Sequence, residues 1–166
     1  MFDRIFRALV AVSLGLALLT VATAGPSRNT GADKPDPLVA MFVWWNAAYL
    51  KKDGFTAESF SRYFTPGAVM RINGKDRCKG VEDLASHFRD IQAHTEMVAI
   101  ELPFLDEFTS PAGDRIFTHH FVLARENGKN SRERVMGFAA IENGKISLIN
   151  FVSVPDPPVG SGENQK

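Results

Sequence analysis

The spacing of apolar side chains predicts a long amphipathic helix that begins just before residue 40. Asp36 is a typical N-cap with Pro37 at the first helical position, and Asp53-Gly54 ends the periodic run. Between these limits, apolar side chains recur every three or four residues, as expected for one face of a helix. They are Leu38, Met41, Phe42, Trp45, Ala48 and Tyr49.

Two shorter helices are predicted further along the chain. The first begins after the capping residue Thr56, continues through Phe60 and Phe64, and is ended by residues 65–67 (TPG). The second follows Gly80 and carries a single apolar stripe, which indicates that one side of it is buried. The members of this stripe are Val81, Leu84, Phe88 and Ile91.

After residue 93 the pattern changes from helical spacing to strand-like alternation. A short strand at 68–72 precedes this change and leads into a turn at Asn73-Gly74. The later strands are predicted at 95–108, with an irregularity at Pro103, and at 115–125, 132–141 and 146–154, the last two joined by a tight hairpin at Asn143-Gly144. Helices gathered early and strands gathered late predict an α+β fold, with three helices packed on one face of a curved, mostly antiparallel sheet.

The N-terminal residues have the pattern of a secretory signal peptide. Residues 1–7 carry Arg4 and Arg7, residues 8–21 are almost wholly apolar, and residues 22–24 (ATA) form an A-x-A cleavage site. The alternative is an uncleaved membrane anchor, but the apolar run is shorter than the roughly 20 residues that a spanning helix needs. We therefore expect export to the periplasm or the medium, with cleavage after Ala24.

The remaining chain is expected to form one domain. Residues 25–35 are predicted to be a flexible linker, residues 36–154 the folded domain, and residues 155–166 (PDPPVGSGENQK) a disordered tail, because proline, glycine and polar side chains dominate it. The length of the domain allows a hydrophobic core without disulfides or metals.

Composition and charge exclude several kinds of partner and site. The chain carries 19 basic and 19 acidic residues, so no net field attracts nucleic acid or, after signal cleavage, an anionic membrane. Cys78 is the only cysteine, which excludes an intramolecular disulfide and zinc sites built on paired cysteines. We expect Cys78 to be a small residue in a turn rather than a reactive thiol. A metal site made of His87, His94 and Glu96 fits no established ligand spacing, so neither a metal nor another cofactor is predicted.

Four segments, residues 44–49 (WWNAAY), 63–69 (YFTPGAV), 79–84 (KGVEDL) and 144–146 (GKI), occur in this order along the predicted domain. In pattern and order the chain resembles the nuclear transport factor 2-like (NTF2-like) superfamily, also called SnoaL-like or ketosteroid-isomerase-like. The resemblance implies a cone in which the sheet wraps the first helix and leaves a deep apolar cavity. Members of the superfamily include isomerases, dehydratases, cyclases, epoxide hydrolases and domains that only bind or assemble, so it assigns no activity.

Comparison with two enzyme groups of this superfamily gives candidate catalytic residues. The general-base aspartate of ketosteroid isomerases corresponds to Ile72, which cannot accept a proton, so that chemistry is disfavoured. The similarity to scytalone dehydratase is partial: Tyr49, His94 and His120 match its tyrosine and two histidines. Its supporting aspartate and second tyrosine correspond to Leu50 and Gly74, so the full dehydratase set is absent.

The positions of the histidines in the sequence can also be interpreted without the resemblance. His94, at a junction between helix and strand, has an alternative role as a solvated or capping imidazole. His119 and His120 are adjacent in a strand, so their side chains leave opposite faces and only one can reach a cavity. The alternation of side chains along the strand does not show which face meets the cavity. The choice of His120 as the cavity histidine comes from the resemblance.

Aromatic and polar residues near the expected cavity complete the candidate site. The proposed walls are Trp45, Tyr49, Phe104, Met136 and Phe138, with His120 or Asn150 as the polar group that orients a ligand. Asn150 is equally explained as a ligand contact or as a core amide that is satisfied within the fold. Trp44 lies about 100° from Trp45 around the helix, so only one of the two enters the same groove.

Three arginines, Arg115, Arg132 and Arg134, are expected to form a solvated edge, with carboxylate recognition as the alternative.

Two functional hypotheses follow. In the first, the exported domain binds a small, mostly apolar or aromatic molecule in its cavity, and the resemblance suggests that it forms a homodimer through the sheet. In the second, it is a lyase or isomerase without a cofactor, in which His94 and His120 act as acid and base and Tyr49 polarises an oxygen. A third possibility is a purely structural or assembly role, because the resemblance implies an outer sheet face that commonly pairs subunits.

Overall fold

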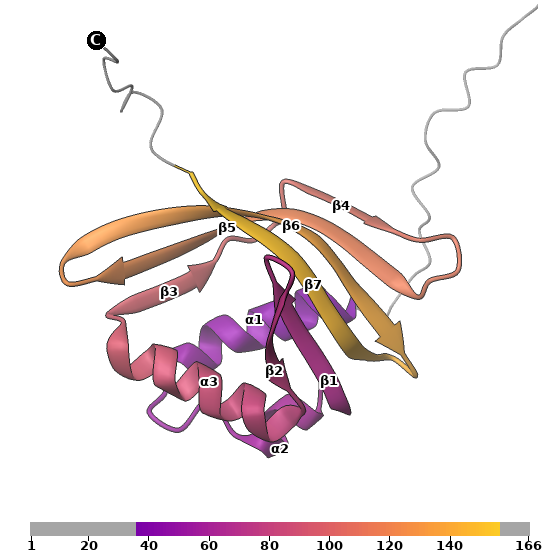
Figure 1. The fold of residues 1–166 in the computed structure, drawn as a ribbon, viewed down its shortest axis with the longest axis horizontal. Helices are drawn as coiled ribbons and strands as arrows, with labels where there is room; N and C mark the ends of the chain where they lie inside the picture. Colours follow the sequence, from indigo (N-terminus) through magenta and orange to yellow (C-terminus); the bar gives the residue numbers. More distant parts are fainter. Residues whose placement is uncertain (1–35, 157–166) are drawn as a thin grey trace, which may run out of the picture. The chain divides into compact units, whose positions relative to one another are not determined.

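The computed structural model describes residues 36–156 of the chain. The predicted signal peptide, the predicted linker and residues 157–166 lie outside the described residues. Figure 1 shows that the three helices lie on one side of a curved sheet, whose long strands arch over them.

Helix α1, Pro37–Tyr49, begins where the sequence predicts it. The Asp36 carboxylate accepts hydrogen bonds from the backbone N–H groups of Leu38 at 2.7 Å and Val39 at 3.2 Å, and so caps the helix. The buried residues of α1 are the six that the apolar spacing identifies, namely Leu38, Met41, Phe42, Trp45, Ala48 and Tyr49. The prediction for this helix is confirmed.

The two later helices also form, with one change of boundary. Helix α2, Ala57–Ser61, is capped by the Thr56 hydroxyl, which accepts a hydrogen bond from the backbone N–H of Ser59 at 3.1 Å. Helix α3 spans Val81–His94. Phe64 is the first residue of a strand and not the end of α2, so the predicted helix was too long.

The sheet has seven strands, in the order β2-β1-β7-β6-β5-β3, with β4 also paired to β5. Their bounds are Phe64–Ile72 (β1), Lys75–Lys79 (β2), Met97–Ile100 (β3), Asp106–Thr109 (β4), Arg115–Glu126 (β5), Lys129–Glu142 (β6) and Lys145–Pro155 (β7). Among the strands of the described residues, only the pairing of β1 with β7 is parallel. The predicted α+β fold with a mostly antiparallel sheet is confirmed.

Three hairpins of the sheet turn at Asn-Gly pairs, which are residues 73–74, 127–128 and 143–144. Both residues of each pair have positive φ, near 51° for the asparagines and near 75° for the glycines. Asparagine and glycine tolerate this conformation best, and turns of this hand match the twist of the flanking strands. The turns predicted at 73–74 and 143–144 are confirmed.

Some strands differ from the sequence-based expectations. Strand β2 was missed because its sequence KDRCK is polar, with only Cys78 buried, as is common for a strand at a sheet edge. The single strand predicted at 95–108 is divided into β3 and β4, and the break contains Pro103, where an irregularity was expected. Strand β7 extends to Pro155, so the predicted disordered tail began too early.

The core lies between the helices and the concave face of the sheet and is rich in aromatic rings. Phe55 and Phe60 are completely buried. Phe88 of α3 stacks on Phe60 with ring centroids 5.6 Å apart. Such rings supply much of the apolar burial that stabilises a domain of this size. Within the described residues, no helix is long and apolar enough to cross a membrane.

Candidate functional site

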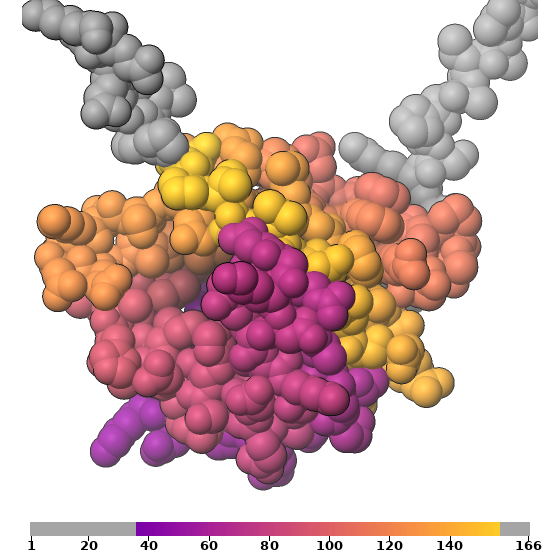
Figure 2. Space-filling view, in the orientation of Figure 1, coloured from indigo at the N-terminus to yellow at the C-terminus, as the bar shows by residue number. Residues whose placement is uncertain are grey.

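A cavity of about 240 Å³ lies between the helices and the concave face of the sheet. Its apolar lining consists of Met41, Phe42, Trp45, Phe60, Phe64, Met70, Ile72, Phe88, Ile91, Val98, Ile100, Val122, Val135, Ile149 and Phe151. Its polar lining consists of His87, His120, Glu133 and Ser153. In the space-filling view, a hollow opens between the β1–β2 hairpin and the β5–β6 end of the sheet (Figure 2).

The alternation of β5 places His120 on the cavity face. Ile116, Thr118 and His120 are all buried, whereas Phe117 and His119 are only partly buried on the opposite face. Since the helices cover the face that carries Ile116, that face is the inner one. The structure therefore selects His120 over His119 as the cavity histidine, which the sequence left open.

The His120 imidazole is held by aromatic rings and lacks a polar partner on one side. Its ring centroid lies 5.3 Å from those of Phe42 and Phe104 and 5.5 Å from that of Phe151. The side chain is 2% exposed, and Nδ1 has no hydrogen-bond partner within residues 36–156. Burial, with a smaller contribution from nearby His119, lowers the pKa of His120 to about 4. The imidazole is therefore neutral near pH 7.

The other polar lining residues were not identified as cavity residues from the sequence. Burial lowers the pKa of His87, although Asp83 and Asp90 act in the opposite direction. His87 lies on the same face of α3 as Leu84, Phe88 and Ile91, because residues 84, 87, 88 and 91 have the spacing i, i+3, i+4 and i+7. The helical spacing could therefore have identified His87 as a residue of the buried face.

Glu133 and Ser153 come from neighbouring strands, β6 and β7. The Ser153 hydroxyl donates a hydrogen bond to Oε2 of Glu133. The Glu133 carboxylate is exposed to solvent, so it brings charge to the cavity lining without being buried there.

Tyr49 and His94 do not join His120 at the cavity. The Tyr49 hydroxyl lies 2.7 Å from Oγ1 of Thr95 and donates to the Thr95 carbonyl oxygen at 3.0 Å, so its polar atom is occupied outside the cavity. His94 is the last residue of α3, with a side chain that is 72% exposed and Nδ1 at 2.8 Å from the Asp90 carbonyl oxygen. The predicted catalytic set is therefore not assembled, and the solvated, capping role of His94 is the one observed.

Of the proposed wall residues, Trp45 lines the cavity, and Phe104 packs against two residues of the lining. Trp45 lines the cavity, and its Nε1 has no hydrogen-bond partner in the described part of the chain. Trp44 points elsewhere and stacks on Tyr63 with ring centroids 5.0 Å apart. Phe104 is not part of the lining and instead packs against the rings of Phe42 and His120, with ring centroids 5.8 and 5.3 Å away.

Met136, Phe138 and Asn150 were wrongly placed in the cavity, because all three lie on the outer face of the sheet. Their neighbours Val135, Ala139, Ile149 and Phe151 are buried on the inner face, and strand alternation turns the intervening side chains outward. Met136 is 47% exposed, and Phe138 packs against Phe117 with ring centroids 5.5 Å apart. Neither predicted role of Asn150, as a cavity ligand contact or a core amide, applies to a partly exposed side chain on this face.

Comparison with known proteins identifies the fold but no close relative. No family model matches the sequence, and no curated protein matches it. An NTF2-like protein of unknown function from Exiguobacterium sp. 255-15 is similar in structure, with a TM-score of 0.58 and 19% sequence identity. The match covers 72% of this chain and 98% of that chain. This domain has the NTF2-like fold.

Two further solved structures share the NTF2-like fold. A protein from Catenulispora acidiphila with a ketosteroid isomerase-like fold, in complex with trimethylamine, has a TM-score of 0.54 and 13% identity and matches over 74% of this chain and 86% of its own. IdmH from Streptomyces antibioticus, proposed to be a polyketide cyclase, has a TM-score of 0.54 and 14% identity, over 73% of this chain and 90% of its own. At these identities the likeness extends to the fold alone.

The NTF2-like cavity of this chain has an apolar residue at the position expected for an isomerase base. Ile72, at the end of β1, lines the cavity. Within residues 36–156, no group of three or more His, Cys, Asp or Glu side chains is close enough to hold a metal ion. Cys78 is buried in β2 and not in a turn, and burial raises the pKa of its thiol to about 12. This thiol is therefore protonated and unreactive at neutral pH.

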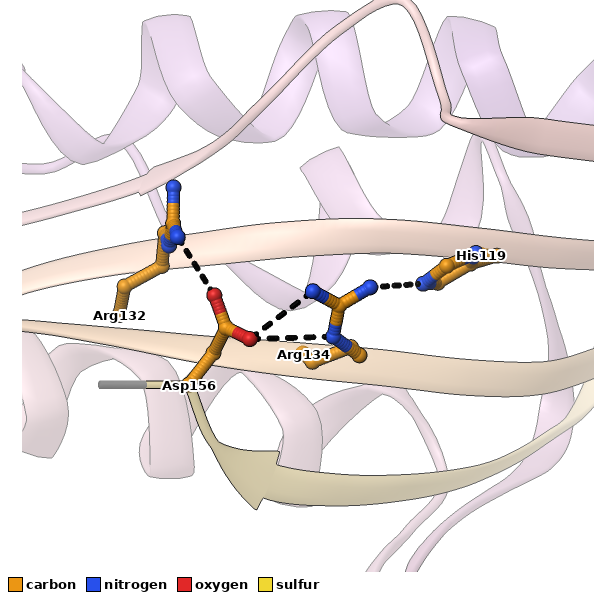
Figure 3. A network of polar contacts seen from close by, with 4 residues as sticks. All are labelled: His119, Arg132, Arg134 and Asp156. Atoms are coloured by element: carbon orange, nitrogen blue, oxygen red, sulfur yellow. Dashed lines mark hydrogen bonds and ion pairs between the residues drawn. The ribbon is translucent and has the colours of Figure 1, made fainter. Parts of the chain in front are cut away.

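The outer face of the NTF2-like sheet carries a polar network that ends at Asp156 (Figure 3). The Asp156 carboxylate accepts hydrogen bonds from Arg134 at 2.9 and 3.1 Å and pairs with Arg132 at 2.6 Å. Arg134 also donates to Nε2 of His119 at 3.0 Å. Hydrogen bonding from Arg134, and then from Arg132, lowers the pKa of Asp156.

This network corrects the expectation for the arginines. Arg132 and Arg134 bind a carboxylate of their own chain instead of forming a solvated edge, and both guanidinium groups lie over the ring of Phe121, at 4.3 and 4.8 Å. Arg115 is exposed, with its guanidinium 5.3 Å from the ring of Phe138. The ion pairs of Arg132 and Arg134 with Asp156 thus hold the residue that follows β7 against the outer face of the sheet.

Proposed function

We propose that this NTF2-like domain binds a small, mostly apolar molecule in the cavity between its helices and sheet. The observation that carries the proposal is His120, a buried imidazole with an unpaired Nδ1 in a cavity lined almost entirely by apolar side chains. A buried polar group without a partner costs about 1–3 kcal/mol of stability. A ligand that contacts this imidazole gives a physical reason for its presence.

Two further observations support binding of a small molecule. The cavity is formed by residues of helices and strands, and its aromatic rings can enclose an apolar ligand. A protein with the same fold was solved in complex with trimethylamine, a small organic molecule. The pattern of residues 1–24 adds the expectation of export, so we propose that binding takes place in the periplasm or outside the cell.

Acid–base catalysis by His94 and His120 with Tyr49 is not part of the proposal. His94 is exposed at the end of α3, and the Tyr49 hydroxyl contacts Thr95. His120 alone remains in the cavity, with a neutral ring near pH 7. One neutral imidazole can orient a ligand, but the second group of the predicted mechanism is missing from the site.

Filling the cavity is expected to abolish binding without unfolding the domain. Val98 lines the cavity from the edge strand β3 and is only partly buried, so a larger side chain there can enter the empty volume. We expect Val98→Trp to weaken binding of naphthalene at least tenfold, measured by ligand-observed NMR on the mature chain, with little change in melting temperature.

The matched control for this test is Val43→Trp. Val43 lies on α1 but is 56% exposed and does not line the cavity, so the same substitution there should leave naphthalene binding unchanged. Naphthalene that fails to bind the wild-type protein, or that binds Val98→Trp with unchanged affinity, would contradict the proposed site.

We also propose that two copies of the domain associate through the outer face of the sheet. Phe108, Met136, Val152 and Val154 are 60%, 47%, 53% and 44% exposed, and Met136 pairs directly with Val152 between β6 and β7. The same face carries cationic Arg115 and anionic Asp106, so a two-fold contact can bring opposite charges together.

A charge placed at the centre of this outer face is expected to separate the two copies. Met136→Glu should convert a dimer into a monomer, measured by light scattering after gel filtration, because a buried carboxylate without a partner opposes association. Val43→Glu, at an exposed position of α1, is the control and should remain dimeric. A monomeric wild-type protein at high concentration would refute the proposed contact.

A further inference from the structure

We infer that the cavity selects an uncharged ligand of one or two rings that presents a hydroxyl group to His120. This inference rests on the proposed function and specifies the class of ligand for the same site. It follows from the volume of the cavity, the charges along its lining and the hydrogen-bonding capacity of one neutral imidazole.

The volume limits the size of the ligand. An apolar cavity of about 150 Å³ is large enough for benzene, and pockets for drug-sized ligands range from about 300 to 1,000 Å³. The cavity here, about 240 Å³, lies between these values. One ring or a fused pair of rings therefore fits, whereas a ligand with four fused rings requires more space than this cavity provides.

The charges of the lining disfavour an anionic ligand. Among residues 36–156, no lysine or arginine lines the cavity, and the one carboxylate of the lining, Glu133, would repel an anion. His120 is enclosed by the rings of Phe42, Phe104 and Phe151, with no carboxylate among its ring contacts that would keep it protonated. An anion would thus lose its hydration without gaining a cation in return.

A cationic group has a possible partner only where the lining is exposed. The Glu133 carboxylate is accessible to solvent and already accepts a hydrogen bond from the Ser153 hydroxyl. A cation placed beside His120 would instead be surrounded by aromatic rings and an uncharged imidazole. Burial of an unpaired charge in such surroundings is strongly unfavourable, so an uncharged group is the better occupant at this end of the cavity.

The imidazole determines which uncharged group fits best. A neutral imidazole has one N–H donor and one nitrogen acceptor, and either nitrogen can carry the proton. A hydroxyl group both donates and accepts, so it can pair with His120 in either tautomer. A carbonyl oxygen only accepts, and a hydrocarbon does neither. Among uncharged groups, a phenol or a cyclic alcohol is therefore the most general partner for a neutral imidazole in the cavity lining.

Three probes of the same shape test this inference on the mature wild-type chain: naphthalene, 2-naphthol and 2-naphthoate. We expect 2-naphthol to bind about tenfold more tightly than naphthalene at pH 7, because it gains a hydrogen bond to a buried group. We expect 2-naphthoate to bind at least tenfold more weakly than 2-naphthol. Dissociation constants can be measured by calorimetry or ligand-observed NMR.

Variants at His120 test whether this residue causes the preference for 2-naphthol over naphthalene. His120→Phe should lose the preference for 2-naphthol over naphthalene, whichever way its affinity for naphthalene changes, whereas His120→Gln, which keeps a donor and an acceptor, should retain part of this preference. A measurement on the wild type does not depend on the folding of either variant. The imidazole NMR signals of His120 should shift with 2-naphthol more than with naphthalene.

The outcomes separate the inference from the proposed function. If neither naphthalene nor 2-naphthol binds, both the proposed function and the inference fail. If naphthalene binds and 2-naphthol gains no affinity, or 2-naphthoate binds most tightly, small-molecule binding stands and the inference about the hydroxyl group is overturned. A preference for 2-naphthol that persists in His120→Phe also overturns it.

Discussion

Replacing Gly137 with alanine is expected to prevent the domain from folding stably. Gly137 lies in β6 with φ at 153°, and a Cβ atom there would lie 2.2 Å from the carbonyl oxygen of Asn150 and 2.8 Å from Cα of Phe151. Both contacts are with the backbone of β7, which cannot move away as a flexible side chain can. The β6–β7 pairing would have to separate at the centre of the sheet.

The expected loss for Gly137→Ala is more than about 3 kcal/mol in the free energy of unfolding, since a backbone clash at a position of positive φ belongs to the largest effects of single substitutions. Urea denaturation followed by circular dichroism measures it. The matched control is Gly67→Ala in β1, where no atom of a non-adjacent residue in the described part of the chain lies within 4 Å of the added Cβ, so stability should change little. Equal stability of the two variants would contradict the close approach of β6 and β7.

Acid is expected to destabilise the wild-type domain through His120. Burial lowers the pKa of this imidazole from 6.5 in the unfolded chain to about 4 in the folded one. Between these values the unfolded state binds a proton that the folded state does not, so stability falls as the pH decreases from about 6.5 to about 4. The corresponding loss is about 3 kcal/mol, because each pKa unit represents about 1.4 kcal/mol.

Substitutions that remove the titrating group test this effect. His120→Phe and His120→Gln should both have a free energy of unfolding that falls about 3 kcal/mol less between pH 7 and pH 4 than that of the wild type, whatever their stability at pH 7. The remaining slope comes from other groups, including His87, whose pKa burial also lowers. Urea denaturation at each pH provides the comparison, and unchanged slopes in both variants would show that His120 is not buried as a neutral group.

Secondary structure was predictable wherever local chemistry was sufficient. The apolar spacing of α1 identified all six of its buried residues, and the turns at Asn73-Gly74 and Asn143-Gly144 were located because few other pairs accept positive φ. Strand β2 was missed because a polar edge strand has no apolar alternation to detect. The Phe64 boundary was wrong because an apolar residue after a short helix is equally compatible with a strand.

The site was less predictable, because alternation shows which residues share a face of a strand but not which face meets the helices. For β5 the two faces were both possible, and the choice of His120 depended on the resemblance. The same ambiguity led to wrong positions for Met136, Phe138 and Asn150, which lie on the outer face. Tyr49 lies on the correct side of α1, but its hydroxyl contacts Thr95, a residue 46 positions away in the sequence.

By itself, the sequence determined the class of the fold, the three helices, most strands and the turns between them, since these depend on interactions among residues close together in the chain. It also determined that the protein has one cysteine and no net charge to attract nucleic acid. Only the tertiary structure decided which side chains surround the cavity. That outcome depends on how the helices pack against one face of the sheet, and contacts between distant segments have no signature in local sequence.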